Sequence, residues 1–226
     1  MLAFGDSITN GGGELQWGVA LQSWALWVAR GLGLPFTTYA VDGARVTDVL
    51  GGQIPAFTQR SATPEARYDL GCLYIGVNDV RALDWNRDVF EAGLSEALGF
   101  LAARCDRVLT ATAPLDLGRP RAGTKVLELN AAVVRAAAAA GALLLDLGDF
   151  GARNQVMPDQ VHPTAFGQIA IAERALTVVE GDGMQVRVRP SSLVYYEPTR
   201  WGQLRGDATY AYRRTKVSLR AALRLN

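Results

Sequence analysis

The sequence predicts an α/β fold built on a parallel five-stranded sheet. Two observations lead to this prediction: short apolar runs recur along the chain, and longer segments with apolar residues at helical spacing lie between them. Strands of a parallel sheet are covered on both faces, so they read as nearly unbroken apolar runs joined by helices. The predicted strands span residues 1–5, 37–41, 70–75, 108–113 and 143–147.

The connecting segments have the pattern of helices. In the first of them, apolar side chains recur every three or four residues and mark one helix face: Trp17, Leu21, Trp24 and Val28. In the fourth, the run of five alanines at 136–140 has high helix propensity. The helix after the last strand is expected to end before the glycines at 181 and 183. The predicted helices span residues 17–31, 47–57, 88–104, 125–140 and about 164–179.

Charge divides the chain into two unequal parts. From residue 182 to the end there are nine Lys and Arg residues against three Asp and Glu, whereas the remainder has 14 basic and 19 acidic residues. We therefore expect a domain at 1–180 and a basic, aromatic-containing extension at 181–226. Within the extension, 184–188 alternates like a short strand and 210–225 has the pattern of a basic helix.

The extension also carries apolar residues that a purely electrostatic arm would not need. Leu219, Leu223 and Leu225 follow several aromatic residues and favour packing on the body or on a partner subunit, that is, in a homo-oligomer. Contact with an anionic membrane surface is the alternative, and we expect no nucleic acid partner.

Composition excludes several classes of protein. The 226 residues are 49% hydrophobic and 20% charged, as in a globular protein, and none of the apolar stretches reaches the roughly 18–20 residues of a membrane span. No signal peptide is apparent ahead of the first motif, so we expect a cytoplasmic protein. A single histidine and two cysteines, Cys72 and Cys105, without C-x-x-C spacing argue against a zinc site and favour free thiols.

Reactive side chains follow the predicted strands. Ser7 comes after the first, Gly43 after the second and Asn78 after the third, while His162 ends the loop after the fifth. Because the carboxyl ends of parallel strands meet at one edge of a sheet, and ligands bind there, these segments are expected to converge.

The residue types fit nucleophilic catalysis. A serine hydroxyl needs an adjacent base, and His162 is the only imidazole in the chain. Asp159, three residues upstream, is placed to hold the second imidazole nitrogen. The backbone N–H groups of Ser7 and Gly43 and the side-chain amide of Asn78 are candidate donors to an oxyanion. The scheme needs no metal and no cofactor.

Structural roles are the alternative for each residue taken singly. A serine after a strand is usually a turn or cap residue, and Asp6 and Asp79 are read as structural carboxylates that bind loop N–H groups. The glycines at 11–13 lack the Lys-Ser/Thr of a phosphate loop and are read as a flexible loop on the substrate side. Three aromatic residues are candidates to line a pocket or to lie in the core: Trp17, Trp85 and Phe150.

Together these segments resemble the four sequence blocks of the SGNH, or GDSL, hydrolase superfamily: Phe4-Gly5-Asp6-Ser7-Ile8-Thr9, Gly43, Gly76-Val77-Asn78-Asp79 and Asp159-Gln160-Val161-His162-Pro163. The resemblance covers about residues 1–179. It implies a flavodoxin-like three-layer α/β/α sandwich and metal-independent hydrolysis of acyl esters. Residue by residue it makes Ser7 the nucleophile, Asp159 and His162 the rest of the triad, and Ser7, Gly43 and Asn78 the oxyanion hole.

Other functions remain open from the sequence. The same triad would serve an acyltransferase, in which an alcohol other than water takes the acyl group. A flavodoxin-like sheet also binds flavins or nucleotides without catalysis, but a sole histidine beside Asp159 has no use in such a module. Acyl-chain length and the alcohol of the substrate are not fixed by these motifs, although an acetyl ester is the first expectation.

Overall fold

The predicted parallel sheet is confirmed in the computed structural model, which describes residues 1–15, 19–60, 66–118, 120–152, 154–195 and 200–224. Its five strands are all parallel and lie in the order β2-β1-β3-β4-β5. Every predicted strand is present. Their bounds are β1 Leu2–Gly5, β2 Thr37–Thr38, β3 Tyr68–Tyr74, β4 Cys105–Ala111 and β5 Leu143–Leu145.

The strand order creates a switch point between β1 and β3. After β1 the chain forms β2 on one side of that strand. It then crosses to the other side of β1 and forms β3 there. Gly5 is in register with Tyr74, so the loops that leave β1 and β3 start side by side. Hydrogen bonds continue beyond β2, because the Val41 N–H donates to the Gly5 carbonyl at 3.1 Å, and this brings the loop after β2 to the same edge. Open α/β sheets bind ligands at such an edge.

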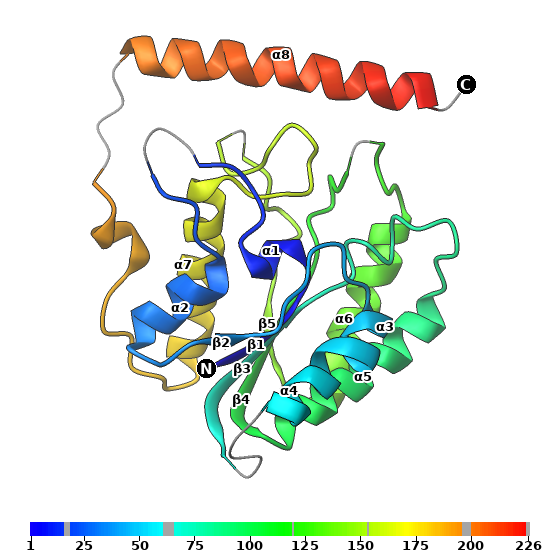
Figure 1. Ribbon diagram of the computed structural model, residues 1–226, viewed down its shortest axis with the longest axis vertical. Helices are drawn as coiled ribbons and strands as arrows, with labels where there is room; N and C mark the ends of the chain where they lie inside the picture. Colours follow the sequence, from blue (N-terminus) through cyan, green and yellow to red (C-terminus); the bar gives the residue numbers. More distant parts are fainter. Residues whose placement is uncertain (16–18, 61–65, 119, 153, 196–199, 225–226) are drawn as a thin grey trace.

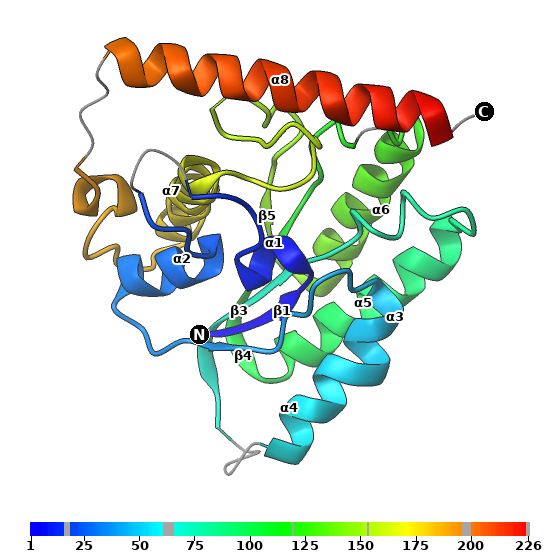
Figure 2. The same cartoon turned by 45° about the horizontal axis from the view of Figure 1, so that its top comes forward.

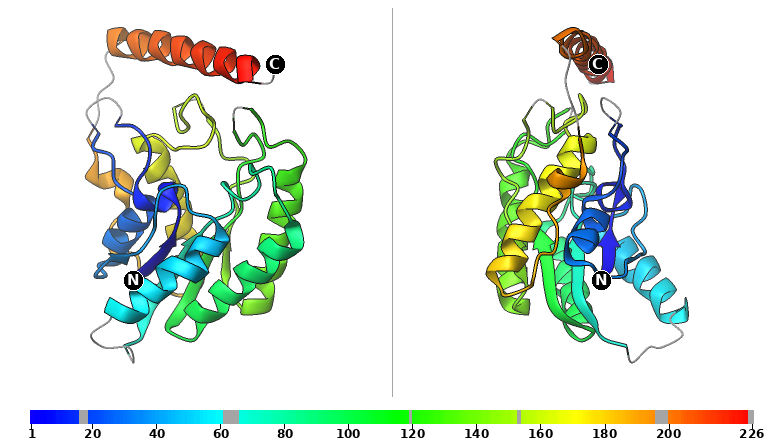
Figure 3. Two further views of the ribbon diagram at one scale, coloured as in Figure 1. Left: turned by 45° about the vertical axis from the view of Figure 1, so that its right-hand side comes forward. Right: turned by 90° about the vertical axis from the view of Figure 1, so that its left-hand side faces the viewer.

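Helices cover both faces of the sheet and give the three-layer sandwich (Figures 1 and 3). One layer consists of α2 Trp24–Leu32 and α7 Ala165–Gly181, which pack against each other. The other layer contains α5 Arg87–Ala102 and α6 Lys125–Ala140, together with the shorter α3 Val46–Asp48, η1 Val49–Gln53 and α4 Ile54–Arg60.

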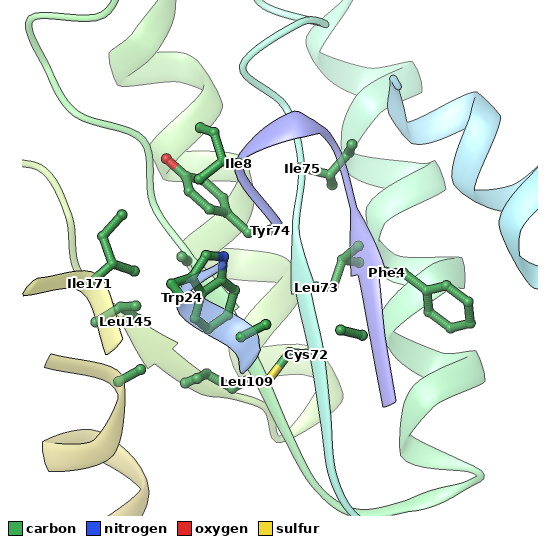
Figure 4. Close-up of a cluster of buried hydrophobic side chains, with 14 of the residues drawn as sticks. Phe4, Ile8, Trp24, Cys72, Leu73, Tyr74, Ile75, Leu109, Leu145 and Ile171 are labelled. Carbon is green, nitrogen blue, oxygen red and sulfur yellow. The ribbon is translucent and has the colours of Figure 1, made fainter. Parts of the chain in front are cut away.

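The core lies between the sheet and these helical layers. Figure 4 shows Phe4, Trp24, Cys72 and Tyr74 among the side chains that fill it, all of them buried. Cys72 and Cys105 are free thiols, as expected. Burial raises the pKa of Cys105 to about 11, so this thiol stays protonated and unreactive at neutral pH.

Two of the predicted helices differ clearly from the observed ones. The helix expected at 17–31 begins at Trp24, where Ser23 accepts a hydrogen bond from the Leu26 N–H and caps it, and Trp17 lies outside the described residues. The helix expected at 47–57 is divided into α3, the π-helical turn η1 and α4. In contrast, α6 spans 125–140 as predicted.

The extension after α7 does not form the short strand predicted at 184–188. Instead, the N–H groups of Arg187 and Val188 donate to the carbonyl of Gly31 at the end of α2, at 2.8 and 3.2 Å. The 3₁₀ turn η2, Pro190–Leu193, follows, with Pro190 buried. These bonds use a helix carbonyl, so the segment lies on the helical layer and adds nothing to the sheet.

The final helix, α8 Arg200–Arg224, begins ten residues earlier than expected. It crosses the molecule above the carboxyl ends of the strands (Figures 1 and 2). Leu219, expected to pack on the body, is instead 60% exposed, and Leu225 lies outside the described residues. None of the helices in the described part of the chain is both long and apolar enough to span a bilayer.

Candidate active site

Ser7 lies on a sharp turn between strand β1 and the short helix α1, Ser7–Asn10. Asp6 caps this helix, since its Oδ1 accepts a hydrogen bond from the Ile8 N–H at 2.9 Å. The turn leaves the Ser7 side chain at the edge of the sheet, where the residue is 7% exposed.

A chain of hydrogen bonds joins the three residues predicted to act together. Ser7 Oγ lies 2.9 Å from His162 Nε2, and His162 Nδ1 lies 2.7 Å from Asp159 Oδ2. The other oxygen, Asp159 Oδ1, accepts from the N–H groups of Val161 and His162 at 3.0 and 3.1 Å. The turn that holds Asp159 and His162 together contains Gln160 in a left-handed conformation, with φ of 57°.

The pKa values of His162 and Asp159 are shifted in opposite directions. The hydrogen bond to Asp159 raises the pKa of His162 above its ordinary value, burial opposes this rise, and the charges of Asp159 and Asp6 add to it. Burial alone would raise the pKa of Asp159, but the hydrogen bonds from His162 and from the Val161 N–H outweigh it and keep this pKa low. The pair therefore favours an imidazolium held by an ionised carboxylate.

Asp6 and Asp79 have the structural role expected of them, because both accept backbone hydrogen bonds. Asp79 accepts from the Val46 N–H at 3.1 Å and so ties the loop after β3 to α3. Asp6 is fully buried, and within the described residues its Oδ2 has no hydrogen-bond partner. Burial raises the pKa of Asp6 to about 7. This carboxyl is therefore a second titratable group beside the nucleophile.

The candidate oxyanion donors lie on loops after the first three strands. Gly43 is the third residue of a turn closed by the hydrogen bond from the Ala44 N–H to the Val41 carbonyl, and its φ is 76°. A residue with a side chain would be strained at that angle. Asn78 donates one side-chain N–H to the Ala44 carbonyl at 3.0 Å, which orients its amide.

Two buried glutamines that sequence reasoning missed hold the nucleophile turn in place. Gln53, on η1, accepts from the Gly5 N–H at 3.0 Å and donates to the Gly5 carbonyl at 2.7 Å. Gln168, on α7, donates to the carbonyls of Ile8 and Gly12. Each is a polar residue on a helix face that is otherwise buried, which is the only signal in the sequence that marks them.

The glycines after the nucleophile are explained by close packing, and not by the flexible loop we expected. The Gly12 N–H donates to the Ser7 carbonyl at 2.5 Å, and a Cβ at position 12 would lie 2.8 Å from that oxygen. A Cβ at position 13 would lie 2.1 Å from the carbonyl oxygen of Pro163. These glycines let the segment after Ser7 approach the loop that carries His162.

A cavity of about 850 Å³ borders Gly43. Its lining is mixed, with Tyr39 and Val41 beside the polar residues Asp42, Asp48 and Arg60. Neither Trp85 nor Phe150, the aromatic residues considered for a pocket, lines this cavity. Phe150 is buried in the core. Trp85 packs on Phe90 with ring centroids 5.5 Å apart and lines a smaller cavity of about 90 Å³ beside Asp79. Within the described ranges, no three His, Cys, Asp or Glu side chains are grouped to hold a metal ion.

Comparisons with known proteins agree with this architecture. The family model described as "GDSL-like Lipase/Acylhydrolase family" matches residues 3–169. No curated protein matches the chain significantly. Among solved structures, the chain is similar to acetylxylan esterase from Geobacillus stearothermophilus, with 21% identity, a TM-score of 0.61, and coverage of 83% of this chain and 96% of that one.

Two further solved structures share the fold. An α/β hydrolase enzyme from the metagenome of Lake Arreo, Spain, has 21% identity and a TM-score of 0.61, over 79% of this chain and 94% of that one. An extracellular lipase from Streptomyces rimosus has 23% identity and a TM-score of 0.57, over 80% and 97%.

Proposed function

Because the chain belongs to the GDSL-like lipase and acylhydrolase family, whose members hydrolyse esters, we propose that it acts through an acyl-enzyme on Ser7, with His162 and Asp159 completing the triad. The observation that carries this proposal is the unbroken chain of hydrogen bonds from Ser7 Oγ through both nitrogens of His162 to Asp159. Such a chain supplies both activation of the hydroxyl and stabilisation of the imidazolium.

The reaction proceeds in two balanced steps. Ser7 Oγ attacks the ester carbonyl carbon while its proton passes to His162 Nε2, and Asp159 stabilises the imidazolium. The tetrahedral intermediate then expels the alcohol, which takes that proton, and leaves an acyl group on Ser7. In the second step, water attacks the acyl carbonyl carbon and gives a proton to His162. The tetrahedral intermediate then releases the carboxylic acid, and Ser7 Oγ takes that proton back from His162.

The negative charge on the carbonyl oxygen needs donors in both steps. We assign the N–H groups of Ser7 and Gly43 and the second side-chain N–H of Asn78 to this role. Support for the assignment comes from the turn at Gly43 and from the bond between Asn78 and the Ala44 carbonyl, which fix two of these groups before substrate binds.

The cavity beside Gly43 is proposed to hold the part of the ester remote from the carbonyl. Its polar side chains favour a polar alcohol, and an acetyl ester of a carbohydrate is the first substrate to test. The structural similarity to an acetylxylan esterase points the same way, although at this identity it establishes the fold alone.

Labelling with a serine-directed phosphonate tests the mechanism. Wild-type protein is expected to gain one adduct on Ser7, and Ser7→Ala is expected to lose both the adduct and turnover of p-nitrophenyl acetate, by about 10⁴- to 10⁶-fold. Ser95→Ala, at an exposed helix position, is the matched control. Turnover within about tenfold of wild type in Ser7→Ala would contradict the proposal. Adding alcohols during turnover and analysing the products separates hydrolysis from acyl transfer.

A further inference from the structure

Helix α8 turns one face toward the body of the protein. Tyr210 and Val217 are half-buried on this face. The Gln160 side-chain N–H donates to the Tyr210 hydroxyl at 3.4 Å, and Arg213 forms an ion pair with Glu14. These contacts determine which side of α8 faces the body.

The opposite face is apolar and exposed. Trp201, Leu204, Tyr212 and Leu219 are 76%, 62%, 67% and 60% exposed, respectively. Their spacings of 3, 8 and 7 residues keep them on one side of an α-helix. We call these four residues the outer stripe. An amphipathic helix normally packs its large apolar side chains on the core, whereas these four side chains face away from the body.

The charge of α8 indicates what kind of surface binds the outer stripe. Residues 200–224 contain seven Lys and Arg residues and a single acidic one, Asp207. Arg200, Lys216 and Arg220 are exposed. Pairing α8 with α8 of a second copy would bring together two strongly cationic segments, whereas an anionic surface is complementary to both the charge and the apolar stripe.

We propose that α8 binds the surface of membranes rich in anionic lipid, with the outer stripe inserted at the level of the headgroups. Because α8 lies over the carboxyl ends of the strands, this orientation directs the edge of the sheet that carries Ser7 toward the membrane (Figure 2). The proposal does not depend on the catalytic one, since binding is measured without turnover.

Co-sedimentation of the full-length protein with vesicles tests it. The protein is expected to sediment with phosphatidylcholine vesicles that contain phosphatidylglycerol, to stay in solution with phosphatidylcholine alone, and to bind more weakly as salt is added. Leu204→Gln/Leu219→Gln is expected to lower the partition coefficient at least about tenfold. Leu127→Gln/Val134→Gln, on exposed positions of α6, is the matched control and should bind like wild type.

Several results would overturn the proposal: no binding of wild type to the anionic vesicles, equal binding to both kinds of vesicle, or equal loss in both double variants. Light scattering provides a further check. A wild-type dimer that becomes a monomer in Leu204→Gln/Leu219→Gln, without vesicle binding, would make the stripe an interface between copies. If that variant fails to fold in a thermal melt, Trp201→Gln/Tyr212→Gln removes the other half of the stripe and replaces it in the test.

Discussion

At the scale of single residues, the most consequential neighbour of the nucleophile is the buried carboxyl of Asp6. Its charge helps to raise the pKa of His162, and its own pKa is raised by burial to about 7. Asp6 and His162 are therefore two interacting titratable groups beside Ser7, each with a raised pKa. The acidic limb of the pH–rate profile reports the pair, and not His162 alone.

Replacing Asp6 with asparagine separates the two groups. Asn keeps an oxygen for the Ile8 N–H but removes the negative charge, so the pKa of His162 should fall. Since His162 accepts a proton only when neutral, the acidic limb of kcat/KM should move to lower pH. The kinetic profile and NMR titration of the sole imidazole measure this shift. Asp84→Asn, at an exposed ion pair, should leave the limb in place, and an unchanged or upward shift in Asp6→Asn would contradict the reasoning.

Asn78 offers a second test at this scale. Removing its amide in Asn78→Ala should lower kcat by about 10²- to 10³-fold with a smaller change in KM, because the donor acts mainly on the transition state. Steady-state kinetics with p-nitrophenyl acetate measure both values. A change confined to KM would instead assign Asn78 to substrate binding.

The sequence predicts the roles of residues whose chemistry is rare better than the roles of residues whose chemistry is common. A sole histidine three residues after an aspartate predicts its partner, and the structure brings Asp159, His162 and Ser7 together. A glutamine on a helix is usually exposed, so the sequence marks Gln53 and Gln168 only by their place on helix faces that are otherwise apolar. Their roles depend on burial, which only the packed fold determines.

At the scale of elements, α6 and the segment 46–60 show what local pattern can and cannot predict. Helix α6 is rich in alanine and ends at Gly141, whose φ of 64° fits a helix C-terminus, so its bounds follow from sequence alone. The segment 46–60 has apolar spacing of the same kind, yet it contains the π-helical turn η1. That turn places Gln53 against Gly5, a contact between residues far apart in sequence.

The turn η1 also borders the proposed substrate cavity, which permits a test. A Cβ added at Gly51 would meet no atom within 4 Å, so Gly51→Leu should fold and project into the cavity. We expect KM for acetylated oligosaccharides to rise by about tenfold or more while turnover of p-nitrophenyl acetate changes little. Gly99→Leu on α5, which has equally open surroundings, is the matched control. Equal effects on both substrates would contradict the assignment of the cavity.

At the scale of the whole molecule, the extension consists of two parts with different attachments. Met184, Val186 and Val194 pack against the core, and Arg189 pairs with Glu180. The described residues of helix α8 are mostly exposed, with Tyr210 and Val217 half-buried, and the contacts of α8 with the body include those of Tyr210 and Arg213. The basic, aromatic composition of the extension did not reveal this division, because the same residue types occur in both parts.

Two truncations should therefore behave differently. Removal of residues 196–226 should change Tm by only a few degrees, whereas removal of 184–226 should lower it by roughly 5–10 °C, at about 2–4 °C per kcal/mol for a chain of this size. Differential scanning calorimetry measures both. Equal losses in the two truncations would mean that α8 contributes to stability as much as the packed segment does.

The hydrogen bonds of Gln168 affect how the enzyme loses activity when it unfolds. Its side chain links the backbone of α1, the glycine segment after it and the Trp24 N–H at the start of α2, and it belongs to the helix that follows His162. Separating the nucleophile segment from the helix that follows His162 therefore requires breaking these buried hydrogen bonds. In a urea titration, loss of activity should coincide with loss of helical circular dichroism. The Trp24 amide should exchange with deuterium as slowly as the most protected core amides, so the site and the fold melt as one cooperative unit.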